Sequence, residues 1–317
     1  METPVIIPLP NTTVAKILKT LQKAREDGGA VALGRVLTLV ITTTKDRSEK
    51  VIAAANQASR EHPMRIIVIS EVPDGFADTP LDAEIRLGGD AGASEVIILN
   101  AADELVVDPQ GLINGLLLPD APMVAWWPDS APSHMSESSL GKVAGHRIAD
   151  TIYADNPLDL LRTLAESYAP GDVDLGWTRI TQWRALFAAT LDAGVTGTIT
   201  GAVVRGAKNN SAPLLLASWF RSELGVPVTL ELGDKDPRGN ILFAEITTTE
   251  GPISIERTEP GFARLIQPRQ PEHAISLPFR GLGDCLAEEL RRLDADVVFG
   301  RVITEGLPKL VAESPAL

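Results

Sequence analysis

Two apolar, β-branched runs on either side of one helix constrain the fold of this chain more than any other feature of its sequence. The first run, Val36 to Thr43, is almost continuously apolar, which is typical of a strand buried on both faces. A helix beginning near Asp46 ends at His62-Pro63, and Met64 to Ile69 forms the second run. A strand, a helix and a strand at this spacing predict a right-handed βαβ unit. The chain therefore begins as an α/β sheet.

Later segments extend this sheet and make it mixed. Leu81 to Leu87 alternates apolar and polar residues, so this strand should lie at an edge or pair antiparallel. Strands of the buried type are predicted at Val96 to Leu99 and Met123 to Trp126, and Pro128 to Ser139 is predicted to form a mobile surface loop. We expect residues 1–168 to form an N-terminal domain with a mixed, mostly parallel α/β sheet.

A second domain is expected after the break at Ala169-Pro170-Gly171-Asp172, over residues 172–317. The pattern predicts a strand, a helix and a strand at 195–204, 211–224 and 226–232. Short strands at 241–248, 253–257, 262–267 and 274–277 predict an antiparallel meander, followed by a helix near 284–293 and a frayed tail after residue 303. The fold class is thus α/β, with a C-terminal α+β domain.

Composition excludes several classes of partner. The 317 residues include 44% hydrophobic residues, enough for real cores, and carry a net charge of -13. This charge argues against nucleic-acid and anionic-membrane surfaces, which rely on clustered Lys and Arg. No apolar run approaches the roughly 20 residues that cross a bilayer. A single cysteine, Cys285, is typical of a protein in a reducing compartment, so we expect a cytoplasmic protein. Cys285 itself is interpreted as a residue that packs a helix.

The motifs that accompany catalysis are missing from the sequence. Ile41-Thr42-Thr43-Thr44-Lys45-Asp46 stands where a dinucleotide-binding sheet carries G-x-G-x-x-G, and no P-loop or G-x-S-x-G motif occurs. The four histidines have no metal-ligand spacing. The Gly88 to Ser94 loop is interpreted as a turn, with a phosphate loop as the minor alternative. We therefore predict no catalytic residues, no cofactor and no metal.

Tryptophan and arginine instead suggest a surface for a protein partner, because these residues dominate binding hot spots. In an extended strand, Trp126 and Trp127 should point to opposite faces, so Trp126 is predicted to pack in the core and Trp127 to face away from it. A second cluster follows the domain break, where the spacing of Arg179 and Trp183 suggests a stacked pair. The predicted partner-binding residues are Trp126, Trp127, Pro128, Trp177, Arg179, Trp183 and Arg184.

Four long motifs resemble one protein family. They are Gly34 to Val40, Glu84 to Glu95, Leu117 to Pro128 and Tyr168 to Arg184. These stretches look like the glucose-6-phosphate dehydrogenase assembly protein OpcA family of actinobacteria, and the similarity spans nearly the whole chain. The resemblance implies a non-catalytic partner that forms a hetero-oligomer with glucose-6-phosphate dehydrogenase. It further implies that the protein promotes the active oligomer of that enzyme and raises its activity in the oxidative pentose phosphate pathway.

Two other functions remain open at this point. The chain could be a degenerate α/β enzyme, or a sensor of sugar phosphates or nucleotides, that uses the Gly88 to Ser94 loop as an anion nest. It could also be a scaffold that holds the dehydrogenase without changing its kinetics. Titration with metabolites separates the first alternative from an activator, and dehydrogenase kinetics separate the second.

Overall fold

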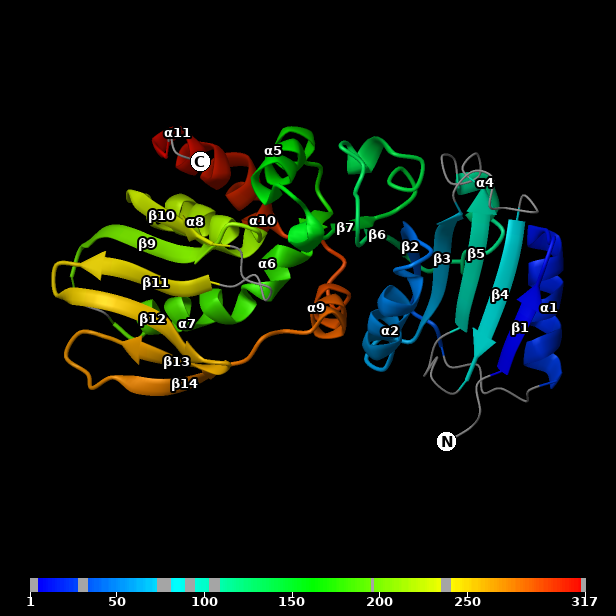
Figure 1. The fold of residues 1–317 in the computed structure, drawn as a ribbon, viewed down its shortest axis with the longest axis horizontal. Coiled ribbons are helices and arrows are strands. Elements are labelled where there is room, and N and C mark those ends of the chain that lie inside the picture. Colours follow the sequence, from blue (N-terminus) through cyan, green and yellow to red (C-terminus); the bar gives the residue numbers. More distant parts are fainter. Residues whose placement is uncertain are drawn as a thin grey trace. The chain divides into compact units, whose positions relative to one another are not determined.

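The computed structural model describes residues 5–27, 34–72, 81–88, 95–102, 109–194, 197–234 and 241–314. The chain divides into two compact units, shown in Figure 1. Unit 1 consists of residues 1–149 and 281–294, and unit 2 of residues 150–280 and 295–317. The boundary thus lies at Ala149 and Asp150, ahead of the break predicted at 169–172, because helix α5 (Pro157–Ser167) packs on helices of unit 2. The segment 281–294 belongs to unit 1, not to the C-terminal half.

Unit 1 is built on a mixed, mostly parallel sheet, which confirms the predicted fold class. Its strands are β1 (Val5–Leu9), β2 (Leu37–Thr44), β3 (Met64–Val72), β4 (Leu81–Leu87), β5 (Glu95–Ala102), β6 (Met123–Trp127) and β7 (His146–Ala149). They are ordered β1-β4-β5-β3-β2-β6-β7. The pairs β5-β3, β3-β2, β2-β6 and β6-β7 are parallel. The central strands β2 and β3 are almost fully buried, as their apolar runs predict.

Two strands of unit 1, β1 and β7, were missing from the sequence prediction. β4 pairs antiparallel with β5, as expected, but it is not an edge strand, because β1 pairs with its other side. Pro8 lies within β1, and an edge strand tolerates proline because one side of its backbone makes no ladder bonds. β7 is a short strand in which His146 and Arg147 are buried, so it lacks an apolar pattern.

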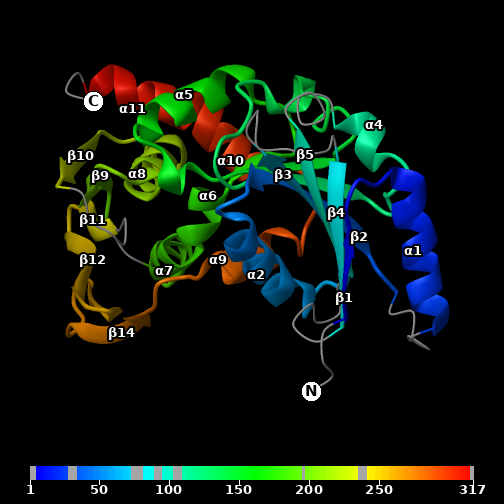
Figure 2. The ribbon, with the colours of Figure 1, turned by 45° about the vertical axis from the view of Figure 1, so that its right-hand side comes forward.

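Helices cover both faces of this sheet, as Figure 2 shows nearly edge-on. They are α1 (Val14–Asp27), α2 (Ser48–Ser59), α4 (Gln110–Ile113) and α9 (Leu282–Glu289), with a short 3-10 helix, η2 (Met135–Glu137). Helices α1 and α4 lie on one side, and α2 and α9 lie together on the other. Cys285 on α9 is buried, which confirms its packing role. The segment expected to be a surface loop buries Met135 through η2.

Unit 2 contains a six-stranded sheet in the order β10-β9-β11-β12-β13-β14 within the described residues. The strands are β9 (Ile199–Ala207), β10 (Val228–Gly233), β11 (Ile241–Thr248), β12 (Gly251–Glu259), β13 (Gly261–Ile266) and β14 (His273–Leu277), and a short strand β8 (Asp172–Asp174) precedes them. β9 and β10 are parallel and joined by helix α8 (Ser211–Leu224). β11 to β14 form an antiparallel meander, as predicted.

The two faces of this second sheet differ in chemistry. Apolar residues such as Val204, Ile246 and Ile255 face the helices and are fully buried. The opposite face carries ion pairs between neighbouring strands, including Arg205 with Glu231 at 2.6 Å and Arg264 with Glu256 at 2.5 Å. This alternation is the pattern of an antiparallel sheet with one solvated face.

The helices of unit 2 extend to the end of the described chain. They are α5, α6 (Leu175–Arg179), α7 (Thr181–Asp192), α8, α10 (Val297–Arg301), a π-helical turn η4 (Val302–Gly306) and α11 (Leu307–Glu313), with a 3-10 turn η3 (Thr151–Tyr153). The tail predicted to fray is therefore helical as far as Glu313. It packs on α8, since η4 and α11 both contact that helix.

Candidate partner-binding site

The strand order of unit 1 marks one place where open α/β sheets bind ligands. The parallel strands β5-β3-β2-β6-β7 follow the order of a dinucleotide-binding sheet, in which the chain reverses direction across the sheet between β2 and β6. Ligands of such sheets bind at the carboxyl ends of these two strands. The segment Trp126-Trp127-Pro128 ends at this point, because β6 finishes at Trp127.

Side chains occupy this switch point. Asp129, which follows β6, accepts hydrogen bonds from Thr43 Oγ1 at 2.5 Å and from Arg47 Nη1 at 2.6 Å. Arg47 directly precedes helix α2, where the glycine loop of a dinucleotide-binding sheet would approach the pyrophosphate. The glycines that would allow close approach of a pyrophosphate are absent from this turn, and Asp129 engages the guanidinium of Arg47 there.

The first cluster of predicted partner residues is buried. Trp126 is 0% exposed, which confirms it as a core residue. Trp127 is 4% exposed, although the alternation of the strand predicted that it faces away from the core, and Pro128 is buried too. The physical reason is that helices cover both faces of this sheet, so that all five residues of β6 are buried on whichever face they lie. The alternation of side chains along a strand assigns residues to the two faces of the sheet, but it does not predict that either face is exposed to solvent.

The second cluster lies at the start of α6 and α7 in unit 2. Trp177 is 2% exposed, donates a 2.7 Å hydrogen bond from Nε1 to Asp296 and packs on Phe299 with 5.7 Å between ring centres. The guanidinium of Arg184 lies 3.5 Å from the centre of the Trp177 ring. Arg184 also donates to Thr181 Oγ1 at 3.1 Å. A cation-π pair therefore exists in this region, between Arg184 and Trp177.

The contacts of Arg179 and Trp183 differ from those of Trp177 and Arg184. Arg179 forms two hydrogen bonds to the carboxylate of Asp150, at 2.6 and 2.7 Å, in a bidentate ion pair. Trp183 is 3% exposed, and the guanidinium of Arg257 lies 5.7 Å from its ring centre. Both residues thus hold unit 2 together.

A second carboxylate lies beside this ion pair, at the start of α6. Asp174 is fully buried and accepts hydrogen bonds from the backbone nitrogens of Gly176 at 2.7 Å and Thr151 at 2.9 Å. Burial and, second to it, the neighbouring charge of Asp150 raise the pKa of Asp174 to about 6, against the lowering effect of Arg179 and the two backbone hydrogen bonds. The pKa of this carboxyl group therefore lies well above that of an ordinary aspartate.

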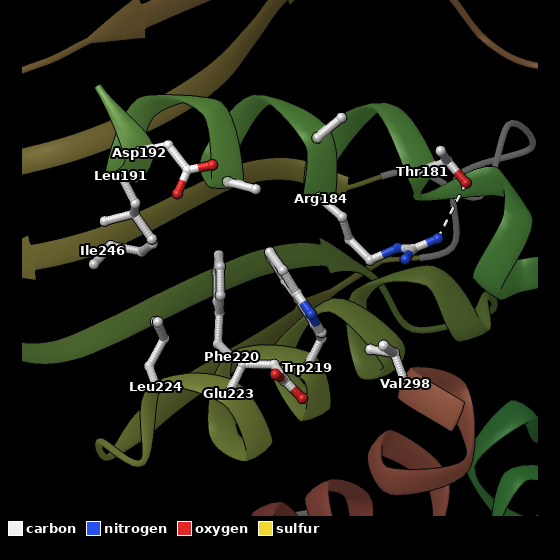
Figure 3. A pocket seen from close by; sticks show the side chains of 12 residues that line it. Thr181, Arg184, Leu191, Asp192, Trp219, Phe220, Glu223, Leu224, Ile246 and Val298 are labelled. Carbon is white, nitrogen blue, oxygen red and sulfur yellow. Dashed lines mark hydrogen bonds between the residues drawn. The ribbon is translucent and has the colours of Figure 1, made fainter. Parts of the chain in front are cut away.

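An open apolar groove of about 480 Å³ lies between α7 and α8 (Figure 3). From α7, one helix face with spacing of three and four residues contributes Thr181, Arg184, Ala185, Ala188, Leu191 and Asp192. From α8, Trp219 and Phe220 project into the space between the helices. Phe220 and Ile246 are fully buried at the base, whereas Ala185 and Ala188 are exposed. The small alanines leave room opposite the aromatic rings.

Charged groups surround the mouth of this groove. Arg184 and Asp192 come from α7, and Glu223 of α8 pairs with Arg301 at 3.0 Å. An apolar centre with aromatic residues and a polar rim is the usual composition of a protein-binding surface. Of the seven predicted partner residues, Arg184 lines this groove, and Trp177 supports the guanidinium of Arg184.

The α8 side of the groove was not among the predicted partner-binding residues. Trp219 was visible as one of five tryptophans, and Trp219-Phe220 on a predicted helix was the available signal. Which of two adjacent aromatic residues faces solvent depends on how α8 packs on its sheet. Phe220 is buried against Phe187, with 5.0 Å between ring centres, and Trp219 is half-buried.

Among the residues that the structure describes, no group of three His, Cys, Asp or Glu side chains is placed to hold a metal ion. Over the same residues, none of the helices has the length and apolar character that crossing a membrane requires. His146 contacts Glu289 through Nε2 at 3.0 Å, and His62 contacts the carbonyl of Ala287 at 3.0 Å, so both histidines have partners.

Solved structures with this fold are oxidoreductases of very different sequence. An oxidoreductase from Sinorhizobium meliloti matches with a TM-score of 0.51 and 10% identity, covering 88% of this chain and 98% of that one. A levoglucosan dehydrogenase in complex with NADH and levoglucosan matches with a TM-score of 0.51 and 12% identity, covering 87% and 97%. At such identities the likeness shows the fold alone. No curated protein is significantly similar in sequence.

Two family models match the chain. The model described as the glucose-6-phosphate dehydrogenase subunit N-terminal domain matches residues 55–166, and the model described as the C-terminal domain of the same subunit matches residues 170–303. Together they cover most of the sequence, including two of the four motifs on which the resemblance rested and all but the first two residues of a third. The chain belongs to the OpcA family of glucose-6-phosphate dehydrogenase subunits.

Proposed function

We propose that this protein binds glucose-6-phosphate dehydrogenase, promotes its active oligomer and raises its activity, without catalysing a reaction itself. The observation that carries the proposal is membership of the family, since both matching models are described as parts of a glucose-6-phosphate dehydrogenase subunit. The occupied switch point, with Asp129 held by Thr43 and Arg47, supports a role other than dinucleotide chemistry. Such a hetero-oligomer would form in the cytoplasm, where the dehydrogenase acts.

The groove between α7 and α8 is our candidate for the contact with the dehydrogenase. It combines an apolar base, the half-buried Trp219 and the stacked guanidinium of Arg184. Tryptophan and arginine contribute most to interface energies when they are held in place before binding. The partner would then not touch Trp177, Trp183 or Arg179. These residues would act indirectly, by holding helices α6 and α7 in position.

Activation requires that the chain bind the active dehydrogenase oligomer more tightly than the inactive form. A ligand with equal affinity for two states shifts no equilibrium, and a tenfold preference corresponds to about 1.4 kcal/mol. A scaffold without activating effect would bind both forms equally. Dehydrogenase kinetics with and without this chain, at fixed enzyme and varied glucose 6-phosphate, therefore separate an activator from a scaffold.

Two alanines on α7 provide a sharp test of the groove. Ala188 is exposed and lines the groove, whereas the neighbouring Ala189 is exposed but is not part of it. Ala188→Glu places a carboxylate among apolar side chains that a partner would bury, so we expect the affinity for the dehydrogenase to fall at least about tenfold. Ala189→Glu adds the same charge to the same helix and should bind and activate as the wild type does.

The readouts are the dissociation constant from sedimentation or calorimetry with purified dehydrogenase, and the activation of that enzyme. Unchanged binding by Ala188→Glu would place the contact elsewhere, while leaving the function intact. A wild-type chain that neither binds the dehydrogenase nor changes its kinetics would end the proposal itself. Circular dichroism and thermal unfolding of both variants confirm that the helix is preserved.

The alternative of a sugar-phosphate or nucleotide sensor rests on the Gly88 to Ser94 loop. Residues 89–94 lie outside the described part of the chain, so this alternative stays a prediction. Thermal unfolding with glucose 6-phosphate, 6-phosphogluconate and nicotinamide nucleotides, in the absence of dehydrogenase, tests it. Stabilisation by none of these compounds would count against it.

A further inference from the structure

The groove between α7 and α8 has two ends with different chemistry. Leu191 and Asp192 of α7 lie at one end, together with Leu224 of α8 (Figure 3). Thr181 and Arg184 line the other end. Asp192 is the last residue of α7 and Leu224 is the last residue of α8, so both helices terminate at the same end of the groove. We call this end the carboxyl end of the groove.

The carboxyl end of the groove favours a cation. The aligned peptide dipoles of a helix give its carboxyl end roughly half a negative charge, and two helices contribute here. Asp192 adds its carboxylate, and the last turn of α7 contains no basic residue. The side chain of Asp192 is exposed, and within the described part of the chain neither an ion pair nor a hydrogen bond engages it. A positively charged ligand group would therefore be stabilised at this end.

Asp192 does not stabilise the helix that carries it. A carboxylate in the last turn of a helix interacts unfavourably with the helix dipole. The charged residues in the last turn of α8 differ, because both are paired. Arg221 pairs with Glu313 at 2.6 Å, and Glu223 pairs with Arg301 at 3.0 Å. Among the described residues, neither the helix nor an ion pair accounts for Asp192 at the groove, which leaves its carboxylate available to a bound group.

The walls of the groove favour a helix as its occupant. Both walls are helices, whose backbone N–H and C=O groups bond within the helix and cannot pair with an added strand. A helix satisfies its own backbone groups, so it can enter an apolar groove without leaving them unpaired. Ala185 and Ala188 lie one turn apart on the exposed face of α7, and their small side chains allow another helix to approach closely. Trp219 projects from α8 on the other side and can pack against apolar side chains of that helix.

We propose that this groove receives an amphipathic helix of the dehydrogenase, which packs its apolar face between α7 and α8 and presents a lysine or arginine to Asp192. The inference rests on the proposed function, because it names the segment of that same partner. The 12 residues of α7 rise about 18 Å, so the occupant needs about three helical turns. Charge pairs at an interface fix register and partner choice. Asp192 would thus determine which helix the groove accepts.

Two charge reversals test the basic residue of the occupant. Asp192→Lys and Glu166→Lys each replace an exposed carboxylate in the last turn of a helix, and Glu166 lies on α5, outside the groove. A lysine in the last turn suits the helix dipole, so both variants should fold. We expect Asp192→Lys to bind purified dehydrogenase at least about tenfold more weakly at low salt, and Glu166→Lys to bind as the wild type does. The difference should narrow in about 0.5 M sodium chloride, because salt screens exposed charges.

Photo-cross-linking tests whether the occupant is a helix. A benzophenone maleimide on Ala185→Cys or on Asp192→Cys places the reactive group along the groove or at its carboxyl end. Cys285 is buried and should not react in the folded chain, and wild type treated with the same reagent is the control. With dehydrogenase in excess, we expect mass spectrometry to map both products to one helix of that enzyme. A lysine or arginine should lie within one turn of the site that is linked from Asp192→Cys.

Three results would overturn this proposal. The first is equal affinity of Asp192→Lys and Glu166→Lys for the dehydrogenase, with thermal unfolding showing that both are folded. The second is cross-linking to a strand or loop of the dehydrogenase, or to a helix without a basic residue, and the third is cross-linking to a second copy of this chain. Each leaves the proposed function intact as long as the wild type binds and activates the dehydrogenase, whereas loss of that binding would end both proposals. If Asp192→Lys does not fold, the cross-links decide alone.

Discussion

The indole nitrogen of Trp177 donates a 2.7 Å hydrogen bond to Asp296, and this bond ties helix α6 to the start of α10. The same carboxylate caps α10 by accepting hydrogen bonds from the backbone nitrogens of Val298 and Phe299, each at 2.9 Å. One aspartate thus joins two segments that are more than a hundred residues apart. The direct role of Trp177 is therefore to stabilise unit 2, and not to contact a partner.

Replacing Trp177 with phenylalanine should measure this bond. The smaller ring keeps most of the apolar packing but leaves Asp296 without its indole donor, so we expect the free energy of unfolding to fall by about 1–3 kcal/mol. Trp177→Ala should cost about 3–5 kcal/mol, because it also removes a buried ring. Urea unfolding followed by circular dichroism gives both values. Equal stability of Trp177→Phe and wild type would contradict the structural role.

The contact between Arg47 and Asp129 supports a second prediction, at the switch point of unit 1. The side chain of Arg47 is 38% exposed and that of Asp129 is 14% exposed, so solvent screens part of the attraction. A double-mutant cycle with Arg47→Ala and Asp129→Ala should give a coupling energy of about 1 kcal/mol. Asp129→Ala should cost more than Arg47→Ala, since Thr43 also loses its acceptor. Additive effects of the two substitutions would show that the pair is not coupled.

The strands of both sheets were predictable where their burial pattern is simple. The apolar runs of β2 and β3 and the alternation of β4 depend on local sequence alone, and the antiparallel meander follows from short strands separated by turns. β1 and β7 were missed because proline and buried charged residues conceal their strand pattern. The compact units divide the chain at Ala149 and Asp150 and not at the predicted break, because the packing of α5 and the return of α9 to unit 1 depend on contacts between distant segments.

The candidate site was less predictable than the fold. The tryptophans of the sequence indicated a surface that binds a protein partner, but four of the five indoles are buried. Trp219 is the one that lines the groove. Exposure of an aromatic residue depends on which element covers it, and no local pattern records this.

The close approach of the C-terminal helix to α8 supports a third prediction. A Cβ atom at Gly306 would lie 2.4 Å from the backbone oxygen of Ser218, which cannot move without moving α8. Gly306→Ala should therefore destabilise the protein by about 1–3 kcal/mol, despite the higher helix propensity of alanine. Gly111 on α4 has open space around its Cβ position, so Gly111→Ala should be neutral or stabilising by up to about 1 kcal/mol. Urea unfolding compares the two, and equal effects would contradict the packing of η4 on α8.

The buried carboxyl group of Asp174 gives the stability of unit 2 a defined pH dependence. Its pKa is raised to about 6, from an unfolded value near 3.8, mainly by burial and then by Asp150, so the folded state holds a proton that the unfolded state releases. The stabilisation from this group is complete below about pH 4 and is lost as the pH rises through 6. For one group this amounts to at most about 3 kcal/mol.

Asp174→Asn should remove this component of the pH dependence. The amide oxygen can still accept a backbone hydrogen bond from Gly176 or Thr151, but the side chain no longer ionises. The difference in unfolding free energy between variant and wild type should therefore shift in favour of the variant as the pH rises from 4 to 7. Urea unfolding at one-unit intervals measures it, and the carboxylates that do not interact with Asp174 cancel in the difference. A difference that stays constant over this range, or moves in favour of the wild type, would show that Asp174 is ionised throughout.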